Sequence, residues 1–412
     1  MNNENFDQML EKYADVTVRV GLNLRKGQRL VIQALLDDTP FVRRVTESAY
    51  KAGARYVDVS FNDEKLARIR FEHADPESIT EVPDWAIVRN EEYLKRGDAF
   101  LSIASSDPDL LNGINPELIA KNRKARAEKF EPLRKYENEY NWCVVSTASP
   151  SWAKKIFPDI PVEQAQAKLW EAIFSACRID VADPVQAWKD HTDKLIQYRD
   201  YLNAKRYTSL HYTAPGTDLM VGLPENHFWE GGGSTFKNGI FGIPNLPTEE
   251  VFTTPHKDQV DGVVKASFPL NLQGVLIEDF SITFEKGKAV KVTAKKGEED
   301  LRKLLETDEN AGRLGECALV PNSSPIGQRG HLFYNTLFDE NASCHLAFGN
   351  SYRESIQGGT EMTEEEFAAA GGNKSLIHVD FMIGSAEMNI DGICADGTRE
   401  PVLRAGEWAF KV

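Results

Sequence analysis

The chain has 412 residues and a formal net charge of −15 at pH 7, from 63 acidic and 48 basic residues. Hydrophobic residues make up 41% and charged residues 27%, an ordinary globular composition that excludes intrinsic disorder and collagen-like repeats. So negative a charge disfavours binding to nucleic acid or to an anionic membrane, and the length predicts two domains, or three.

The first half of the chain alternates helices with short apolar strands. Thr39 is expected as the N-cap and Pro40 as the first residue of a helix that Gly53 ends. Pro132 is expected to interrupt a long charged helix. Strands separated by helices are typical of βαβ units and predict a mostly parallel sheet. The predicted strands are 30–34, 56–61, 100–103 and 142–145, and the predicted helices are 6–13, 39–52, 117–140, 164–177 and 185–205.

The second half is richer in short strands and glycine turns. Its pattern predicts an α+β fold with an antiparallel bias, and a hairpin turn at 285–288. We place the domain boundary near Arg206, which gives an N-terminal α/β domain, 1–205, and a C-terminal α+β catalytic domain, 206–412. The predicted strands are 207–213, 218–222, 261–268, 281–284, 289–294 and 376–383, and the predicted helices are 298–306 and 363–370.

The cysteine pattern and the chain's apolar segments bear on its compartment. The five cysteines form no C-x-x-C pair, so disulfides and a thiolate zinc site are not expected. The first fifteen residues contain no apolar signal-peptide core, and no apolar run approaches the roughly 20 residues that span a bilayer. We therefore expect a cytoplasmic protein that does not bind membranes.

The segment 376–383 holds a histidine and an aspartate on one face of a strand. His378 and Asp380 alternate with apolar residues, so the opposite face is a core face. Because both flanks are apolar, we expect a central strand on which neither polar side chain is freely solvated. A buried carboxylate needs a partner, and a metal ion also suits a neighbouring imidazole. A structural His–Asp hydrogen bond, or a polar face open to water, is as plausible for this pair alone.

Four more acids and a second histidine lie at strand edges or tight turns. Glu340 and His345 are five residues apart across small residues, where a turn could aim both at one point. Glu316 follows a glycine and enters an apolar strand, while Glu249 and Glu250 follow two prolines that stiffen the chain. Taken singly, His345 is more simply a core histidine, and either of the paired acids a surface residue.

The acids and histidines together make a stronger pattern than any of them alone. Three glutamates, an aspartate and two histidines suit two divalent cations of the zinc, cobalt or manganese type. Without a thiolate, such a set is typical of a catalytic site. Two such ions can share a carboxylate, lower the pKa of a water molecule and polarise a carbonyl group, which is hydrolytic chemistry.

Several familiar motifs are absent from the sequence. It has no H-E-x-x-H zinc motif and no G-x-S-x-G nucleophile motif. The glycines at 231–233 lack the surroundings of a phosphate-binding loop, so we interpret them as a turn. A basic stretch at 121–129 is interrupted by an acid and lacks aromatic residues, which favours a solvated helix face over an RNA site.

Four segments give the sequence a family resemblance. They are Val31–Gln33, Asn245–Thr253, Asn335–Ala342 with His345, and His378–Asp380. In these segments, and over essentially its whole length, the chain resembles the thermophilic-type metallo-aminopeptidases, the family of aminopeptidases S and T. The resemblance implies a cytoplasmic exopeptidase that removes N-terminal residues from peptides. It also implies two divalent ions (Zn, Co or Mn, with Mg possible) and a homodimer whose site opens into an internal cavity.

The resemblance also implies roles for individual residues. Glu316 would bridge the two ions, and Tyr352 would donate a hydrogen bond to the reacting oxyanion or touch a metal, unless it only packs beside the site. Glu250 fits better as a ligand than Glu249, because it directly precedes the apolar Val251. Glu249 is then a candidate general base or ammonium-binding group. The implied metal ligands are Glu250, Glu316, Glu340, His345, His378 and Asp380.

Two other functions fit a similar set of ligands. A dimetal phosphoesterase would add arginine or lysine to hold the phosphate, and the basic residues near the ligands in sequence are scattered singly (Arg313, Arg329, Arg353 and Lys374). A non-enzymatic metal-binding protein would result if the ligands did not converge.

Overall fold

The computed structural model describes residues 3–136, 139–272 and 275–412. These residues form two compact units. The first comprises 1–189 with the returning segment 233–247, and the second comprises 190–232 with 248–412. The chain first passes from one unit to the other inside the long helix α8 (Pro184–Lys205). The domain boundary near Arg206 stays a prediction.

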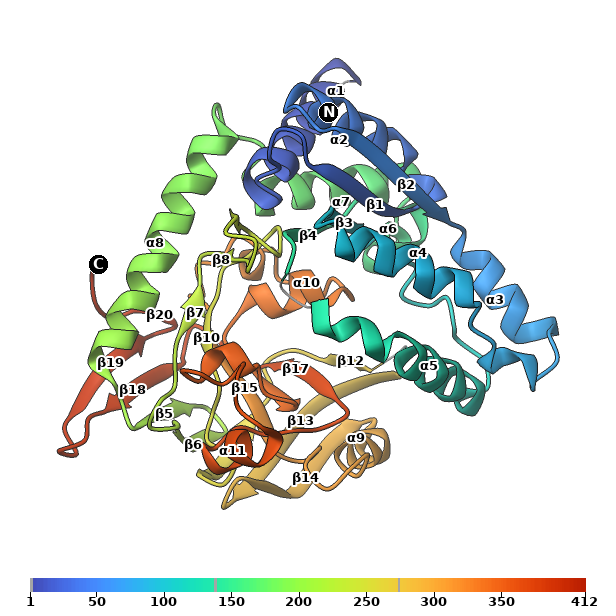
Figure 1. Cartoon of the computed structure of the whole chain (residues 1–412). Helices are drawn as coiled ribbons and strands as arrows, with labels where there is room; N and C mark the ends of the chain where they lie inside the picture. The colour runs from blue at the N-terminus through green and yellow to red at the C-terminus, as the bar shows by residue number, and fades with distance from the viewer. Residues whose placement is uncertain (1–2, 137–138, 273–274) are drawn as a thin grey trace. The chain divides into compact units, whose positions relative to one another are not determined.

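The first unit is built on a four-stranded parallel sheet in the order β2-β1-β3-β4 (Figure 1). All three strand pairings are parallel, which confirms the α/β prediction for this half. Its main strands are β1 (Arg29–Leu35), β2 (Tyr56–Asn62), β3 (Ala99–Ile103) and β4 (Trp142–Val145), and β8 (Ser234–Thr235) pairs with β9 (Phe241–Gly242). Its helices are α1 (Asn3–Val16), α2 (Thr39–Lys51), α3 (Glu64–His73), α4 (Asp84–Lys95), α5 (Pro116–Phe130), α6 (Pro150–Ile156) and α7 (Val162–Ala176).

Helix boundaries in this unit show where the sequence pattern was misleading. Thr39 is the first residue of α2 and not its N-cap, because a 3-10 turn leads directly into the helix and Asp38 holds the cap position. Pro132 does interrupt the charged helix, which gives way to a 3-10 turn after Phe130. The sequence did not predict α3, since none of its residues is buried and no apolar stripe marks it.

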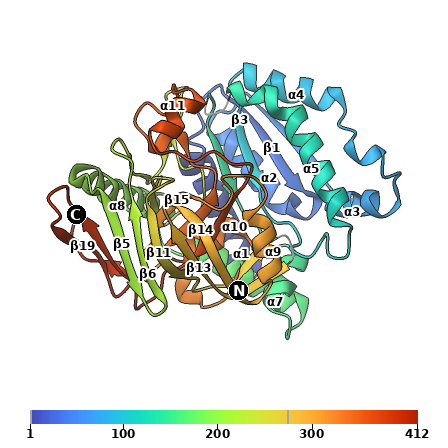
Figure 2. The ribbon, with the colours of Figure 1, turned by 90° about the horizontal axis from the view of Figure 1, so that it is seen from below.

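The second unit contains two antiparallel sheets, which confirms its α+β character. One has five strands in the order β17-β16-β15-β10-β7, and the other has nine. Figure 2 shows β5, β6, β11 and β13 of the larger sheet side by side. The five strands are β7 (Glu230–Gly231), β10 (Val251–Thr253), β15 (Leu314–Leu319), β16 (His345–Gly349) and β17 (His378–Met382). The nine are β5 (Ser209–Ala214), β6 (Thr217–Gly222), β11 (Val260–Lys265), β12 (Leu270–Leu272), β13 (Val275–Glu285), β14 (Lys288–Lys296), β18 (Asn389–Ile393), β19 (Arg399–Arg404) and β20 (Glu407–Trp408). Its shorter helices are α9 (Glu298–Leu305), α10 (Thr336–Asp339) and α11 (Glu364–Ala369).

The two sheets of the second unit share one hydrophobic core. Phe280 of β13 packs on Phe381 of β17, with ring centroids 5.9 Å apart, and Phe284 packs on Phe348 of β16 at 6.4 Å. All four rings are at most 1% exposed. One face of the five-stranded sheet is therefore committed to the core.

Strand β17 corrects one expectation from the sequence. It is the edge strand of the five-stranded sheet and not a central strand. Its polar side chains are still largely shielded, with side-chain exposures of 22% for His378 and 11% for Asp380. The expectation that neither polar side chain is freely solvated is therefore confirmed, although Leu376, in the apolar flank before the strand, is 84% exposed.

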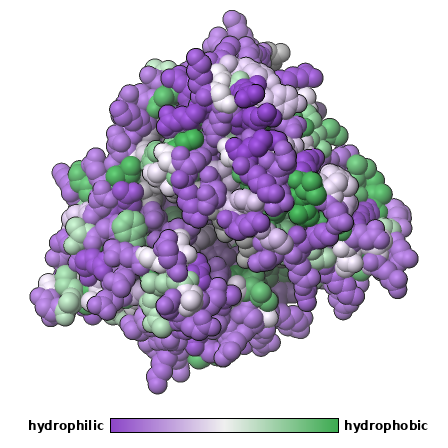
Figure 3. Space-filling view, viewed as in Figure 1, coloured by the Kyte–Doolittle hydropathy of each residue, from purple (hydrophilic) through white to green (hydrophobic). Residues whose placement is uncertain are grey.

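Two sequence-level expectations concern the described residues as a whole. All five cysteines are free, which confirms that no disulfide holds the fold. Among the helices that the structure describes, none is long and apolar enough to cross a membrane. The face drawn in Figure 3 is mostly hydrophilic, with hydrophobic residues scattered over it, as the acidic composition leads one to expect.

Candidate metal centre

Five of the six expected ligands lie on or directly before neighbouring strands of the five-stranded sheet. Glu316 lies in β15 and His345 begins β16. His378 and Asp380 lie in β17, and Glu250 directly precedes β10. The strands β17, β16, β15 and β10 are adjacent in that order, so segments up to 130 residues apart in sequence meet here.

The strand register places these side chains on one face of the sheet. Glu316 is paired with Ala347, and Ala347 is paired with Asp380. Paired residues point to the same side of a sheet, so the three form a row across β15, β16 and β17. Ala347 is the small member in the middle, which leaves space between the two carboxylates. The opposite face carries core residues such as Leu346 and Phe381.

Within this face the ligands form two groups that share Glu316. In one group, His345 Nε2 lies 3.2 Å from Glu250 Oε2 and 3.9 Å from Glu316 Oε1. In the other, His378 Nε2 lies 3.1 Å from Glu316 Oε2 and 3.4 Å from Asp380 Oδ1. In each group the potential ligand atoms lie within 4.8 Å of one another. Each oxygen of Glu316 therefore faces a different histidine, which is the arrangement of a bridging carboxylate.

Both imidazole rings present Nε2 to the carboxylates because Nδ1 is engaged elsewhere. His345 Nδ1 lies 3.2 Å from the Ser343 carbonyl oxygen, and His378 Nδ1 lies 2.8 Å from the Asn350 carbonyl oxygen. A carbonyl only accepts hydrogen bonds, so Nδ1 carries the proton in each ring. In the neutral ring this leaves the Nε2 lone pair free to bind a metal ion.

The buried carboxylates create a strongly negative site. Burial raises the pKa of Glu316, and the charges of Asp380 and Glu250 add to the effect. Burial also raises the pKa of Glu340 well above its usual range, again with Glu250 and Asp380 contributing. Asp380 is the exception: burial favours a higher pKa, but the hydrogen bond from His378 and the charges of His378 and His345 together outweigh it and lower the pKa. Divalent cations would relieve this repulsion.

The side chains present fit a metal centre. Glu250 Oε2 is buried and makes no hydrogen bond with the described residues, although His345 Nε2 lies 3.2 Å away. In the metal-free protein this oxygen is balanced only by the imidazole of His345, and a divalent cation would satisfy it when that imidazole is neutral. The set contains only nitrogen and oxygen donors, which suits zinc, cobalt or manganese.

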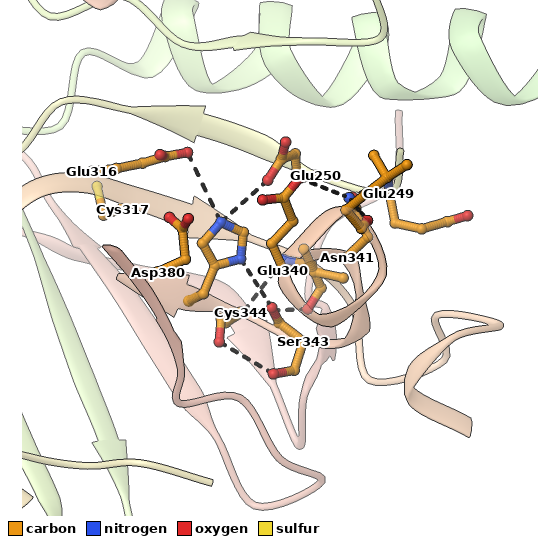
Figure 4. Close-up of polar contacts among 12 residues, drawn as sticks. Glu249, Glu250, Glu316, Cys317, Glu340, Asn341, Ser343, Cys344 and Asp380 are labelled. Carbon is orange, nitrogen blue, oxygen red and sulfur yellow. Dashed lines mark hydrogen bonds and ion pairs between the residues drawn. The ribbon is translucent and has the colours of Figure 1, made fainter. Parts of the chain in front are cut away.

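Glu340 borders the two groups without belonging to either one. It opens the 3-10 turn Glu340–Ala342, and Figure 4 shows its carboxylate among those of Glu250, Glu316 and Asp380. With Asp380 it also lines a cavity of about 50 Å³, which is room for one or two water molecules. Its place suits a ligand that completes the site from the side of the cavity.

Tyr352 lies against the second group through its ring. The ring centroid is 4.8 Å from that of His378 and 5.7 Å from that of Phe252. Partial burial and the negative charges of Glu316 and Asp380 raise its pKa. The hydroxyl therefore stays protonated at neutral pH and is able to donate a hydrogen bond.

Glu249 and Glu250 are directed differently. Glu249 Oε2 lies 3.6 Å from His191 Nε2, and the Glu249 N–H donates to Asn341 Oδ1 at 2.7 Å. Glu249 belongs to neither group of potential ligands, whereas Glu250 does. His191 and Asn341 had no distinguishing signal in the sequence, because their partners are far from them along the chain.

Gly315, which directly precedes Glu316, has a structural role of its own. The pairing of β15 with β16 shifts register between Leu314 and Glu316. A Cβ atom on Gly315 would lie 2.2 Å from the Asn350 carbonyl oxygen and 2.5 Å from that of Gly349. Only glycine fits this close approach, which brings the Asn350 carbonyl to His378.

Gly315→Ala is expected to lower the free energy of unfolding by about 2 kcal/mol, the usual cost of overpacking. It should also weaken metal binding, because the backbone that orients His378 must move. Denaturant unfolding and metal analysis of the purified variant measure both effects. Gly312→Ala is the control, since the nearest atom to its Cβ is 3.5 Å away. Equal stability of Gly315→Ala and wild type would show that the close approach does not exist.

Comparisons with known proteins match almost the whole chain. The family model described as thermophilic metalloprotease (M29) matches residues 6–408. The chain is 48% identical to aminopeptidase AmpS of Bacillus subtilis over 409 residues, covering 99% of this chain and 100% of that protein. It is 47% identical to aminopeptidase T of Thermus thermophilus, covering 98% and 99% respectively. The solved structure of wild-type AmpT from Thermus thermophilus matches with a TM-score of 0.93 and 47% identity, over 98% of this chain and 100% of that one.

Proposed function

Because this chain belongs to the thermophilic metalloprotease (M29) family, we propose that it is an aminopeptidase that hydrolyses the first peptide bond of peptides at a two-metal site. One observation supports the two-metal site: two groups of potential ligands, one with His345 and one with His378, share Glu316. A single ion would need only one of these groups. The two relatives are both aminopeptidases, which supports the substrate class.

The protein's own side chains have separate tasks in this proposal. Two divalent ions, when bound, supply Lewis-acid polarisation of the scissile carbonyl and lower the pKa of the attacking water. Glu316 would be the ligand common to both ions, and the two histidines and the remaining carboxylates would complete their sites. Glu249, outside the ligand set, is the candidate to receive the substrate's α-ammonium group or to carry a proton to the leaving nitrogen.

Tyr352→Phe is expected to lower kcat about a hundredfold with little change in KM. The phenylalanine keeps the ring contacts with His378 and Phe252 and removes only the hydroxyl, whose hydrogen bond would form to the developing oxyanion. Steady-state kinetics on an aminoacyl nitroanilide measure both constants. Tyr201→Phe, in a ring that stacks on Phe410, is the control. An unchanged kcat in Tyr352→Phe would reduce Tyr352 to a packing residue.

The direct test of the proposed function uses peptides of known sequence. The purified protein, with and without chelator, is incubated with free and N-acetylated forms of the same peptides. Release of N-terminal residues from the free peptides alone, lost with chelator and restored by a divalent ion, is the expected result. Cleavage of internal bonds, or no metal-dependent hydrolysis across the set, would refute the aminopeptidase proposal.

The geometry disfavours a phosphoesterase. Three of the four basic residues near the ligands in sequence make other contacts: Arg313 pairs with Asp258 at 2.8 Å, and Arg353 pairs with Glu364 at 2.9 Å. Lys374 also pairs with Glu364, at 3.0 Å. These three residues hold surface segments together and do not form a phosphate clamp. Because the potential ligands lie close together, the non-enzymatic metal-binding alternative, which assumed that they do not converge, is also disfavoured.

Further parts of the proposal concern the ions, the assembly and the compartment. The ions are zinc, cobalt or manganese, with magnesium possible, because all the ligands are nitrogen or oxygen. The protein acts as a homodimer in the cytoplasm and does not bind nucleic acid, in keeping with its five free cysteines and its charge of −15. Light scattering of the purified protein tests the dimer.

A further inference from the structure

We infer that Asn373 is a positioning residue that fixes His378 as a metal ligand by clamping the peptide unit between Asn350 and Ser351. The inference rests on the proposed two-metal site and adds a residue outside the ligand set. Asn373 lies in the segment between α11 and β17, is 0% exposed, and touches neither histidine in any recorded contact. Its effect reaches His378 through backbone hydrogen bonds.

One peptide unit connects Asn373 to the imidazole. The carbonyl oxygen of Asn350 accepts a hydrogen bond from His378 Nδ1 at 2.8 Å. The N–H of Ser351, which belongs to the same planar peptide unit, donates to the Asn373 carbonyl oxygen at 2.8 Å. A planar peptide cannot turn one group without the other, and hydrogen bonds in such a chain strengthen one another. The orientation of this unit therefore sets that of the His378 ring.

Asn373 holds the backbone before Asn350 with its side chain and the residue after Asn350 with its own backbone. Its Nδ2 donates to the Gly349 carbonyl oxygen at 2.6 Å and to that of Asn310 at 3.0 Å. Its backbone N–H donates to Ser351 Oγ at 3.0 Å. Because both partners of Nδ2 are carbonyl oxygens, which only accept hydrogen bonds, the side chain at this position must be a donor. Residues 349 and 351 are thus tied to one buried side chain and its backbone.

The clamped turn has no space in which to relax. A Cβ on Gly349, whose φ is +91°, would lie 2.2 Å from the Ile377 carbonyl oxygen. The Asn350 N–H donates to that same oxygen at 2.7 Å, and Ile377 directly precedes His378. The turn and the start of β17 are therefore held together as one rigid piece, and Asn373 is its anchor.

The clamp acts on one ligand group and not on the other. His345 is oriented by the Ser343 carbonyl, which belongs to a different segment. Loss of the Asn373 amide should therefore affect the ion held by Glu316, His378 and Asp380, and leave the ion at Glu250, Glu316 and His345 largely unaffected. A general loss of folding would weaken both ions alike.

The test is calorimetric titration of the chelator-treated, full-length protein with Co²⁺. We expect wild type to bind two ions, and Asn373→Ala to bind one of them about 10- to 100-fold more weakly, with the other changed less than about threefold. In the His378→Ala background, Asn373→Ala should add no further loss, because it acts through His378. In the His345→Ala background its full effect should remain.

Two further variants keep the result interpretable. Ser351→Ala removes only the acceptor of the Asn373 N–H and serves if Asn373→Ala does not fold; a smaller loss at the same ion is expected. Asn389→Ala, whose amide also bonds to backbone groups, is the control and should bind both ions normally. Equal weakening of both ions, additivity with His378→Ala, or two unchanged affinities would overturn the inference alone. Failure of wild type to bind Co²⁺ would instead refute the two-metal proposal itself.

Discussion

Glu316→Gln is expected to abolish peptide hydrolysis, with kcat lower by at least about a thousandfold. The amide keeps one oxygen but replaces the other with an NH2 group that cannot bind a cation, so one of the two ion positions loses its shared ligand. A loss of about 4 kcal/mol of transition-state stabilisation corresponds to this factor. Kinetics at saturating metal measure the effect on turnover, and metal analysis of the variant measures the effect on metal binding.

The same variant should be more stable than wild type when both are free of metal. Glu316 is 4% exposed and lies among other carboxylates, so burial and repulsion raise its pKa. Glutamine removes the charge and most of that cost. Glu361→Gln, at an exposed position, is the control and should change neither activity nor stability. Normal activity and metal content in Glu316→Gln would refute the bridging role.

Removal of metal is expected to abolish activity and to lower Tm by about 5–10 °C. Each ion present at a hundredfold excess over its Kd stabilises the fold by about 2.7 kcal/mol, so two ions contribute about 5.4 kcal/mol. Each kcal/mol shifts Tm by about 1 °C in a protein of 412 residues, because the entropy of unfolding grows with chain length. Differential scanning calorimetry before and after chelation, and after return of Zn²⁺ or Co²⁺, measures the loss and its recovery. An unchanged Tm with full loss of activity would argue against buried metal ligands.

The pH dependence of metal binding follows from the two histidines. Burial lowers the pKa of each, but Glu250 outweighs it at His345 and raises the pKa to about 10, while Asp380 and Glu316 raise that of His378 to about 11. Both rings are thus protonated at neutral pH in the metal-free protein and must lose a proton to bind an ion. Binding at pH 7 should release at least two protons, and the apparent affinity should rise with pH up to about 10.

The stability of the metal-free fold should change with pH in the opposite direction to the metal affinity. The pKa values of both histidines lie above the ordinary value of 6.5. Their contribution to stability is therefore complete below pH 6.5 and is lost as the pH rises through 10 to 11. Calorimetric titrations in buffers of different ionisation enthalpy count the released protons. His211→Ala, which removes a histidine of the larger sheet, should leave the number of released protons unchanged. If wild type released no protons, the assignment of both rings as protonated in the metal-free protein would be wrong.

The parallel sheet of the first unit could be predicted from local sequence. The strands around Leu30, Val57, Leu101 and Val144 are short apolar runs between helices, and they form the parallel sheet as expected. Helix α3 and the edge position of β17 could not be predicted. A helix without a buried face leaves no periodic signal, and a strand's apolar flanks report burial but not the number of neighbouring strands.

The sequence by itself determined which residue types take part at the site. A His and an Asp two positions apart on a strand must share a face, and a Glu inside an apolar strand must meet a counter-charge, whatever the fold. Only the tertiary structure decided how they combine. The register of β15, β16 and β17 aligns Glu316 with Asp380 across Ala347, and the clamped turn at Asn350 aims His378 at Glu316. These pairings join segments many residues apart, and long-range contacts of this kind leave no periodic mark on a single sequence. The division of the ligands into two groups around one shared carboxylate therefore appears only when the sheet is assembled.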